Sequence, residues 1–159
     1  YLFLWFSFYN IVNSYNYTLM KKFVQISNKP SFMKHNGGLL FRIINKKKFE
    51  FKTKVKKTHL NKAGITHGGF LCTIIDAGAG TSAHKSTGNK PCVTISLDVK
   101  FIGPSNLGDE IIGTVDIMKI TKSMVFLSCK LKSKNKIIAT ALGIWKILRR
   151  PLPNAGFGG

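Results

Sequence analysis

The run from Gly68 to His84 places the tightest limits on the fold. It reads GGFLCTIIDAGAGTSAH, which is too long for a single strand and is rich in glycine, alanine and isoleucine. Such a run predicts a buried helix, whose glycines allow close approach to a sheet although each costs about 1 kcal/mol of helix propensity. The chain after it changes to the period of two that is typical of strands. A buried helix followed by consecutive strands predicts an α+β fold, in which a curved antiparallel sheet wraps around the helix.

Strands are predicted on both sides of this helix. Upstream, an apolar segment at residues 39–45 and an alternating one at 49–57 predict a hairpin with its basic side chains on the solvated face. Downstream, residues 93–101 alternate between apolar and polar, and short polar turns separate three more apolar segments, at 111–120, 124–131 and 137–148. This order predicts four consecutive strands in a meander.

The two ends of the chain are less regular. An N-terminal helix is expected at about residues 10–27, because Asn28 and Pro30 then form a turn signal. The apolar stretch at 1–12 either belongs to this helix or precedes a true start at Met20. It is shorter than the roughly 20 residues of a membrane span and lacks the basic region of a signal peptide, so neither is expected. The chain therefore divides into an N-terminal extension (1–30), a folded domain (31–148) and a disordered tail (149–159).

The charge balance is strongly basic: 25 Lys and Arg residues face 6 Asp and Glu, for a formal net charge of +19. A surplus of this size is typical of proteins with an anionic partner, such as nucleic acid, a membrane surface or a phosphorylated small molecule. However, only Arg42, Arg149 and Arg150 are arginine, and proteins that recognise nucleic acid depend more on arginine for bidentate contacts. The charge is equally consistent with a compositional bias, and nucleic acid is not the expected partner.

The cysteines and histidines indicate neither a disulfide framework nor a metal site. Cys72, Cys92 and Cys129 lie far apart in the sequence and form no C-x-x-C pair. The four histidines form no ligand motif such as H-E-x-x-H. We expect no metal and no cofactor, and a reducing compartment, either cytoplasmic or mitochondrial.

Asp76 is the only formally charged residue between Lys62 and Lys85, and apolar residues flank it in the predicted helix. Burying a lone carboxylate is costly. Its presence in a buried helix therefore indicates either a hydrogen bond to the backbone of another element or a catalytic role.

A glycine pair, Gly68 and Gly69, opens the same helix. Backbone N–H groups at the positive end of a helix dipole suit a developing oxyanion, although a plain glycine-rich helix entry looks the same. Gly68 and Asp76 are eight residues apart, which is about 12 Å along an ideal helix. Both can act on one carbonyl only if the substrate lies along the helix or a second subunit brings its own Gly68. The spacing predicts a dimer.

These residues together resemble the signature of a known family. The pattern N-x-x-G-x-x-H-G-G-x₆-D comprises Asn61, Gly64, His67, Gly68, Gly69 and Asp76. It is similar to the motif of hot-dog-fold thioesterases, in the branch of the 4-hydroxybenzoyl-CoA, phenylacetate-type and acyl-CoA thioesterase 13-like proteins. The likeness runs over about residues 39–148 and includes the segment 98–104. It implies an α+β hot-dog fold, and hydrolysis of a fatty or aryl acyl-CoA to the free acid and coenzyme A.

The resemblance also implies a role for each matching residue. Asp76 corresponds to the catalytic carboxylate, as general base or nucleophile, and the Gly68 N–H to the group that polarises the thioester carbonyl. Asn61 corresponds to an amide that positions water or the carbonyl, and Thr94 to a hydroxyl that orients the water. The stretches that match coenzyme A contacts comprise Lys57, His67, Ser96, Phe101, Lys119, Ile120, Thr121, Lys122, Ser123 and Met124. Family members pair helices across a two-fold axis, so the resemblance implies a homodimer or homotetramer.

Other functions fit the sequence less well. A lipase would need a G-x-S-x-G nucleophile elbow, which is absent. A G-x-G-x-x-A pattern at 78–83 would bind a dinucleotide only inside a βαβ unit, and the chain downstream is all strands. A hot-dog dehydratase would carry its catalytic histidine and acid in a different motif. The remaining alternative is a non-catalytic hot-dog module that binds an acyl carrier or nucleic acid, and the joint presence of Asn61, Asp76 and Thr94 favours the enzyme.

Overall fold

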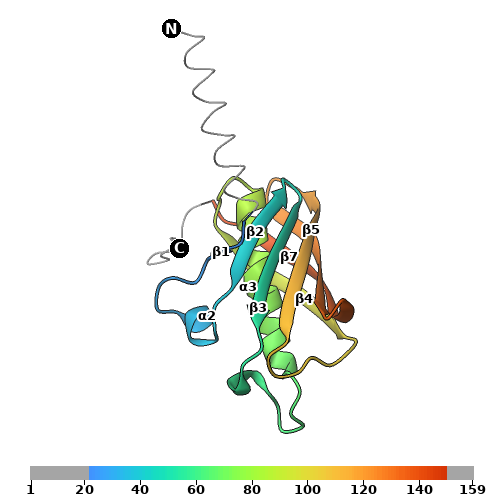
Figure 1. Ribbon diagram of the computed structural model, residues 1–159. Helices are drawn as coiled ribbons and strands as arrows, with labels where there is room; N and C mark the ends of the chain where they lie inside the picture. Colours follow the sequence, from blue (N-terminus) through green and yellow to red (C-terminus); the bar gives the residue numbers. More distant parts are fainter. Residues whose placement is uncertain (1–21, 150–159) are drawn as a thin grey trace.

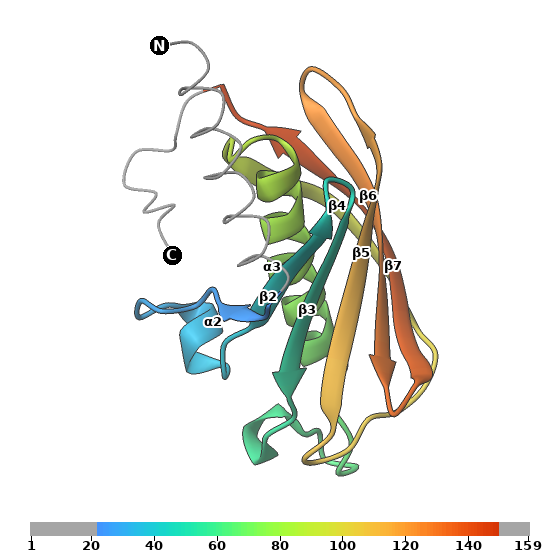
Figure 2. The ribbon, with the colours of Figure 1, turned by 45° about the horizontal axis from the view of Figure 1, so that its top comes forward.

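An antiparallel sheet curves around one long helix in the computed structural model, which describes residues 22–149 (Figure 1, Figure 2). The helix, α3, spans Gly68–Ser86. The strands are β1 (Val24–Gln25), β2 (Leu40–Asn45), β3 (Lys48–Lys54), β4 (Cys92–Phe101), β5 (Glu110–Ile120), β6 (Met124–Ser133) and β7 (Lys136–Ile147). Two short helical turns, α2 (Phe32–His35) and η1 (Lys57–His59), lie in the connections before α3. This arrangement confirms the predicted α+β hot-dog fold.

One side of α3 packs against the concave face of the sheet (Figure 2). The buried residues of the helix recur every three or four positions, and they are Phe70, Leu71, Ile74, Ile75, Gly78, Ala79, Ser82 and Ala83. Gly78 has no room for a side chain, because a Cβ there would lie 2.2 Å from the Phe51 ring of β3. The close contact confirms the prediction that glycine lets this helix approach the sheet.

The strand order corrects one prediction. The sheet runs β1-β2-β3-β5-β6-β7-β4, so only β5, β6 and β7 form the predicted meander. β4 pairs with β7 at the far edge, and β3 takes the place beside β5. The alternation of apolar residues determines which face of a strand is buried, but it does not determine which strand becomes the neighbour. In the chain as described, β4 therefore has one unpaired edge.

The predicted N-terminal helix is wrong over the part that the structure describes. Residues 22–27 contain the strand β1, which pairs with the otherwise open edge of β2. The β-branched residues of this segment favour a strand, and the Phe23 ring lies 4.5 Å from the Arg42 guanidinium. The remainder of the predicted helix, 10–21, and the tail at 150–159 lie outside the described residues.

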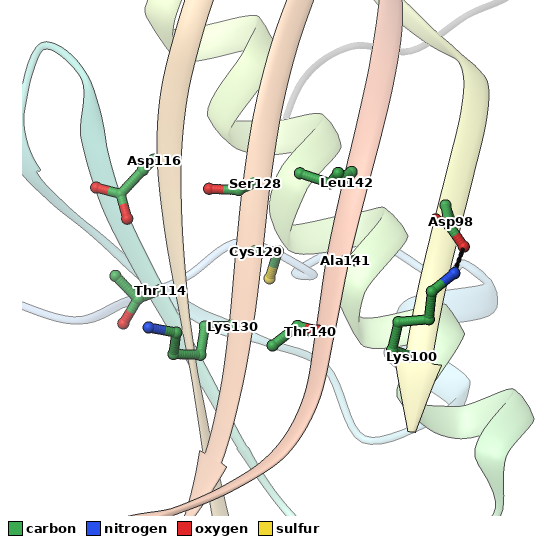
Figure 3. A pocket seen from close by; sticks show the side chains of 10 residues that line it. All are labelled: Asp98, Lys100, Thr114, Asp116, Ser128, Cys129, Lys130, Thr140, Ala141 and Leu142. Carbon is green, nitrogen blue, oxygen red and sulfur yellow. Dashed lines mark hydrogen bonds and ion pairs between the residues drawn. The ribbon is translucent and has the colours of Figure 1, made fainter. Parts of the chain in front are cut away.

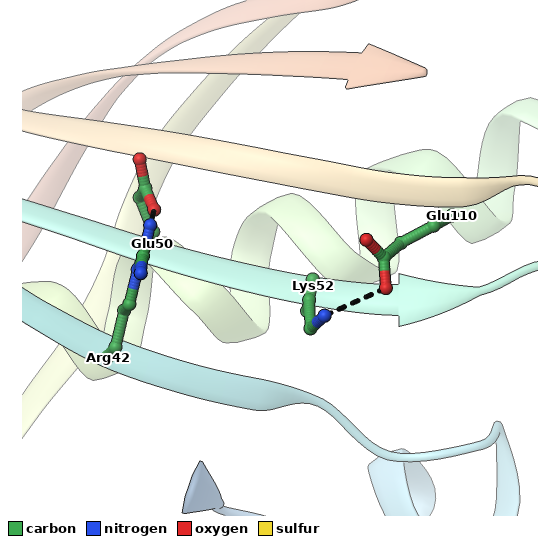
Figure 4. A network of polar contacts seen from close by, with 4 residues as sticks. All are labelled: Arg42, Glu50, Lys52 and Glu110. Atoms are coloured by element: carbon green, nitrogen blue, oxygen red, sulfur yellow. Dashed lines mark hydrogen bonds and ion pairs between the residues drawn. The ribbon is translucent and has the colours of Figure 1, made fainter. Parts of the chain in front are cut away.

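The outer face of the sheet carries ion pairs between neighbouring strands. Figure 4 shows Arg42 of β2 and Glu50 of β3, joined by a hydrogen bond of 2.7 Å from Arg42 Nε, and Lys52 of β3 with Glu110 of β5 at 2.9 Å. The phenylalanines that alternate with these residues in β3 are fully buried on the inner face. The alternation confirms that the basic run of this hairpin lies on its solvated face. No helix in the described part of the chain is long and apolar enough to cross a membrane.

Candidate active site

Asp76 lies on an exposed side of α3, beside the edge strand β4 of the sheet. Its Oδ1 accepts a hydrogen bond of 2.7 Å from the hydroxyl of Thr94 in β4. Among the described residues, the other carboxylate oxygen, Oδ2, has no hydrogen-bond partner. The contact joins the middle of the helix to the edge strand of the sheet, and it leaves one oxygen of Asp76 available to a water molecule or a substrate.

The Asp76 side chain is exposed in the single chain, which corrects the expectation that it is buried. Its sequence neighbours Ile74 and Ile75 are fully buried, but adjacent residues of a helix point in different directions. Asp76 instead shares its face of the helix with Thr73 and Gly80, which are three and four residues away. Apolar neighbours in sequence were therefore a poor guide to the environment of this carboxylate.

One backbone N–H group in the first turn of α3 has no acceptor among the described residues. His67 is the N-cap, and its Nδ1 accepts from the Gly69 N–H at 2.8 Å. The His67 carbonyl accepts from the N–H groups of Phe70 at 2.9 Å and Leu71 at 3.3 Å. Within residues 22–149 the N–H of Gly68 has no acceptor. This N–H points out of the positive end of a 19-residue helix that has no acidic residue in its first turn, so it suits a negatively charged oxygen.

Phe101, the last residue of β4, lies beside Gly68. A Cβ on Gly68 would be 3.3 Å from Phe101 Cζ, tighter than ordinary van der Waals contact. The ring of Phe101 is nevertheless 57% exposed. Phe101 thus forms one wall of the space around the free Gly68 N–H. His67, the N-cap residue directly before Gly68, adjoins the same space. Three residues of the predicted site, Gly68, His67 and Phe101, are brought together here.

Asn61 organises the loop that leads into α3. Its Oδ1 accepts from the backbone N–H groups of Ala63 at 2.9 Å and Ile65 at 3.3 Å. Its backbone N–H donates to the Ile65 carbonyl at 2.8 Å, and Gly64 takes the left-handed conformation (φ +78°) that the turn requires. The amide nitrogen of Asn61 has no partner in the described chain. Asn61 therefore shapes its own loop through its oxygen and keeps an N–H₂ group for a ligand.

The predicted coenzyme A residues are divided between the two ends of the sheet. Lys57 lies two residues after Val55. The backbone of Val55 forms hydrogen bonds with Gly108 (3.0 Å) and Asp109 (2.9 Å), which directly precede β5, so Lys57 lies near the start of that strand. The turn at 119–124 lies at the other end of β5, an eleven-residue strand that spans roughly 33 Å. A single chain does not bring Lys57 and this turn together.

Ser96 lies on a different face of β4 from Thr94. Thr94 pairs with the buried Trp145 and Ser96 with Ile144, with an irregularity in the register between them. Because facing residues of paired strands point to the same side of a sheet, Thr94 points toward α3 and Ser96 away from it. The structure therefore does not place Ser96 beside Asp76 within one chain.

His59 is a residue that the sequence reasoning missed. It is 3% exposed, and its ring stacks on Phe70 at 3.7 Å between centroids. Its Nδ1 accepts from the Lys56 N–H at 3.0 Å, and its carbonyl accepts from the His67 N–H at 2.8 Å. Burial lowers the pKa of His59, a hydrogen bond with the Asn36 backbone opposes this effect, and the nearby positive charge of Lys56 lowers the pKa further. The one available signal was its position two residues before Asn61, within the same loop.

A hollow of about 270 Å³ lies on the outer face of the sheet (Figure 3). Figure 3 shows the ion pair between Asp98 and Lys100 at its rim. Cys129, which also lines it, is not a nucleophile there, because burial raises the pKa of its thiol to about 12. This hollow lies across the sheet from Asp76 and Gly68, so it is not the candidate active site. Within residues 22–149, no three His, Cys, Asp or Glu side chains are grouped as metal ligands.

Comparison with known proteins identifies the family of this chain. Residues 63–139 match the family model described as the thioesterase superfamily. The chain is 32% identical over 88 residues to mouse acyl-coenzyme A thioesterase 13, covering 54% of this chain and 63% of the mouse protein. It is 30% identical over 95 residues to a Pseudomonas aeruginosa protein named as a proposed esterase, covering 59% of this chain and 71% of that protein.

Solved structures show the same architecture. Zebrafish thioesterase superfamily member 2 superposes with a TM-score of 0.69 at 21% identity, over 76% of this chain and 89% of that chain. Mouse thioesterase superfamily member 2 superposes with a TM-score of 0.60 at 27% identity, over 68% and 80%. The chain belongs to the thioesterase superfamily.

Proposed function

We propose that this protein is an acyl-CoA thioesterase, which hydrolyses an acyl-CoA to the free acid and coenzyme A. The observation that carries the proposal is the Thr94–Asp76 hydrogen bond, which orients the carboxylate of Asp76 and leaves its Oδ2 free. The similarity to mouse acyl-coenzyme A thioesterase 13 supports coenzyme A as the leaving group.

The chemistry needs a carboxylate and a donor for the oxyanion. Asp76 Oδ2 either takes a proton from a water molecule that attacks the thioester carbonyl, or attacks that carbonyl itself and is released by water. In both cases the carbonyl oxygen gains negative charge, which the Gly68 N–H would stabilise. The C–S bond then breaks, coenzyme A leaves as the thiol, and the acyl group leaves as the acid. The free Asn61 amide nitrogen would hold the water or the carbonyl from the adjoining loop.

A complete site needs two chains in this proposal. Gly68 and Asp76 of one chain are about 12 Å apart along α3, too far to act on the same carbonyl. The unpaired edge of β4 exposes Ile95 and Phe101, each 57% exposed, which is an unfavourable surface to leave in water. Pairing of two β4 edges about a two-fold axis would run the two α3 helices antiparallel, and it would bring Asp76 of one chain toward Gly68 of the other. Such a homodimer would be the unit from which a homotetramer is built.

The same dimer would bring the predicted coenzyme A residues of two chains close to one another. In an antiparallel pair, the end of one chain that carries Lys57 lies near the end of the other that carries Lys119 and Lys122. The phosphates of coenzyme A would then meet lysines from both chains. Each lysine holds phosphate as a point charge, so each contribution is modest.

The test is hydrolysis of short, medium and long acyl-CoAs by the full chain, followed through the released thiol. We expect turnover, and Asp76→Asn should lower kcat by about 10²- to 10⁴-fold because a positioned base is lost. Asn keeps an oxygen for the Thr94 hydroxyl, so the thermal melting curve should hold. Asp98→Asn is the matched control, because Asp98 is exposed on the outer face and pairs with Lys100. Full activity of Asp76→Asn would contradict the proposal.

A further inference from the structure

The free N–H of Gly68 lies in a segment whose other backbone donors are all occupied. From residue 65 to residue 71, every N–H except that of Gly68 has an acceptor among the described residues. Directly before it, the His67 N–H donates to the His59 carbonyl at 2.8 Å. Directly after it, the Gly69 N–H donates to Nδ1 of His67 at 2.8 Å. The contacts of its neighbours therefore set the direction of the Gly68 N–H.

A pair of buried hydroxyl groups holds this segment from a second loop. Thr66, two residues before Gly68, is 6% exposed, and Ser105, in the connection between β4 and β5, is 1% exposed. The Ser105 hydroxyl donates to Thr66 Oγ1 at 2.7 Å. The Ser105 carbonyl accepts twice from Thr66, from its N–H at 2.8 Å and from its hydroxyl at 3.0 Å. Three hydrogen bonds thus join two residues that are 39 positions apart in the chain.

The connection that carries Ser105 is itself fixed to the sheet. On one side of Ser105, the Gly103 N–H donates to the Ile138 carbonyl of β7 at 3.1 Å. On the other side, the Asn106 N–H donates at 3.0 Å to Oδ2 of Asp109, the residue directly before β5. Because Ser105 lies between these two anchors, it offers Thr66 a fixed partner.

The same pair joins two segments that border the Gly68 N–H. Ser105 lies four residues after Phe101, whose Cζ is 3.3 Å from the place of a Cβ on Gly68. Thr66 lies in the loop that leads directly into α3. The hydrogen bonds between Thr66 and Ser105 therefore hold the start of α3 against the end of β4.

Oxyanion stabilisation depends on such a fixed arrangement. A donor contributes only when it lies about 2.7–3.1 Å from the position that the negative oxygen takes, and a misplacement of about 1 Å can lower the rate about 100-fold. Loops move more than the elements that they connect, and the loop before α3 contains the turn at Gly64. Buried and fully paired hydrogen bonds make a loop rigid.

We propose that Ser105, acting through Thr66, is a positioning residue that directs the Gly68 N–H toward the oxyanion of the thioester. This inference rests on the proposed thioesterase function. Neither hydroxyl touches the substrate, because both are buried and donate their hydrogens inside the protein. The pair then stabilises the transition state without contributing to substrate binding, so its loss should lower kcat and leave KM unchanged.

The first experiment is steady-state hydrolysis of one acyl-CoA by the full chain and its variants. Ser105→Ala should lower kcat about tenfold with KM unchanged, which is the size of effect expected from one buried hydrogen bond. Thr66→Ser keeps the hydroxyl that makes both side-chain bonds and should retain most of the activity. Ser82→Ala is the matched control, because it removes an equally buried serine hydroxyl, bonded to the Gly78 carbonyl at 2.7 Å, and it should leave kcat at the wild-type value.

A second experiment shows whether Ser105 acts through the Gly68 N–H. Gly68→Pro removes this N–H at the first residue of the helix, where proline is well tolerated. In the Gly68→Pro background, Ser105→Ala should lower kcat by less than about twofold further, because the group that it positions is already absent. A purely structural role of Ser105 would give the same tenfold loss in both backgrounds.

The outcomes separate this inference from the proposed function. An unchanged kcat in Ser105→Ala, a loss carried by KM, or an equal loss in the Gly68→Pro background would overturn the role of Ser105 and leave the thioesterase intact. Failure of the wild-type chain to hydrolyse any acyl-CoA would overturn the proposed function and this inference with it. If thermal melting shows that Ser105→Ala does not fold, Thr66→Val/Ser105→Ala decides by the same measurements, because it replaces both hydroxyl partners and leaves no buried donor unpaired.

Discussion

The Thr94 hydroxyl holds Oδ1 of Asp76 at 2.7 Å, from the edge strand to the middle of the helix. We predict that Thr94→Val lowers kcat about tenfold, at the lower end of what hydrogen bonds to charged groups contribute, because the carboxylate loses its fixed orientation. Thr94→Ser keeps the hydroxyl and should retain most of the activity. Steady-state kinetics on one acyl-CoA decides, and an unchanged kcat in Thr94→Val would show that Asp76 is oriented without this bond.

The contact of Gly78 with Phe51 predicts a large effect on stability. A Cβ at position 78 would lie 2.2 Å from the Phe51 ring, which is fully buried and has Gly113 against it as well. Gly78→Ala should therefore destabilise the fold by about 3 kcal/mol, near the upper end for overpacking. Gly80→Ala, on the same helix, meets only Trp145 Nε1 at 3.2 Å and gains about 1 kcal/mol of helix propensity, so it should be close to neutral. Equal midpoints of urea unfolding for the two variants would contradict this account.

The central helix and the paired strands could be predicted because their signals are local. The run at 68–84 is too long for a strand, and the limits of α3 at Gly68 and Ser86 lie within two residues of that run. Strand order is not a local property. β4 lies on the far side of β7 because of packing over the whole sheet, and the alternation of apolar residues within β4 does not determine which strand pairs with it. The strand β1 was missed for a similar reason, since the edge of β2 that it covers is remote in sequence.

The candidate site divides in the same way. Asn61, His67, Gly68 and Asp76 stand in one contiguous motif, so their spacing could be recognised without the fold. The exposure of Asp76 depends on which side of α3 faces the sheet, and it could not be deduced from flanking isoleucines. His59 is distinguished by its burial and by its stacking on Phe70, and neither of these leaves a pattern in the sequence.

A proline at position 68 tests the oxyanion donor directly. Gly68 is the first residue of α3, a position where proline is well tolerated, and the preceding His67 already has the extended backbone (φ −64°, ψ 134°) that a following proline requires. Gly68→Pro should keep the helix, remove the N–H and lower kcat by about 10²- to 10³-fold. Gly68→Ala makes the same Cβ contact with Phe101 but keeps the N–H, so it should lose far less activity. Similar losses in both variants would mean that crowding of Phe101, and not the N–H, is responsible.

The lysines of the β5–β6 turn give a prediction about salt. Lys119→Ala/Lys122→Ala should raise KM while kcat holds, and KM should depend less on salt concentration than in the wild type, because exposed charges act through a screened field. Lys132→Ala/Lys136→Ala, which removes two exposed lysines near the other end of β6 and β7, is the matched control. KM values that do not change at either of two salt concentrations would show that the phosphates of coenzyme A bind elsewhere.

The shared site predicts that two inactive variants restore each other. In the proposed dimer, each active site combines Gly68 of one chain with Asp76 of the other. A Gly68→Pro chain paired with an Asp76→Asn chain therefore forms one site with both substitutions and one site with neither. Random pairing of equal amounts gives half mixed dimers, each with one intact site, so activity should return to about a quarter of the wild-type value per chain. Co-expression of the two variants with different tags allows the mixed dimer to be purified and assayed, with each variant alone as the baseline. If Gly68 and Asp76 act within one chain, every site in the mixture carries a defect and the activity stays at that baseline.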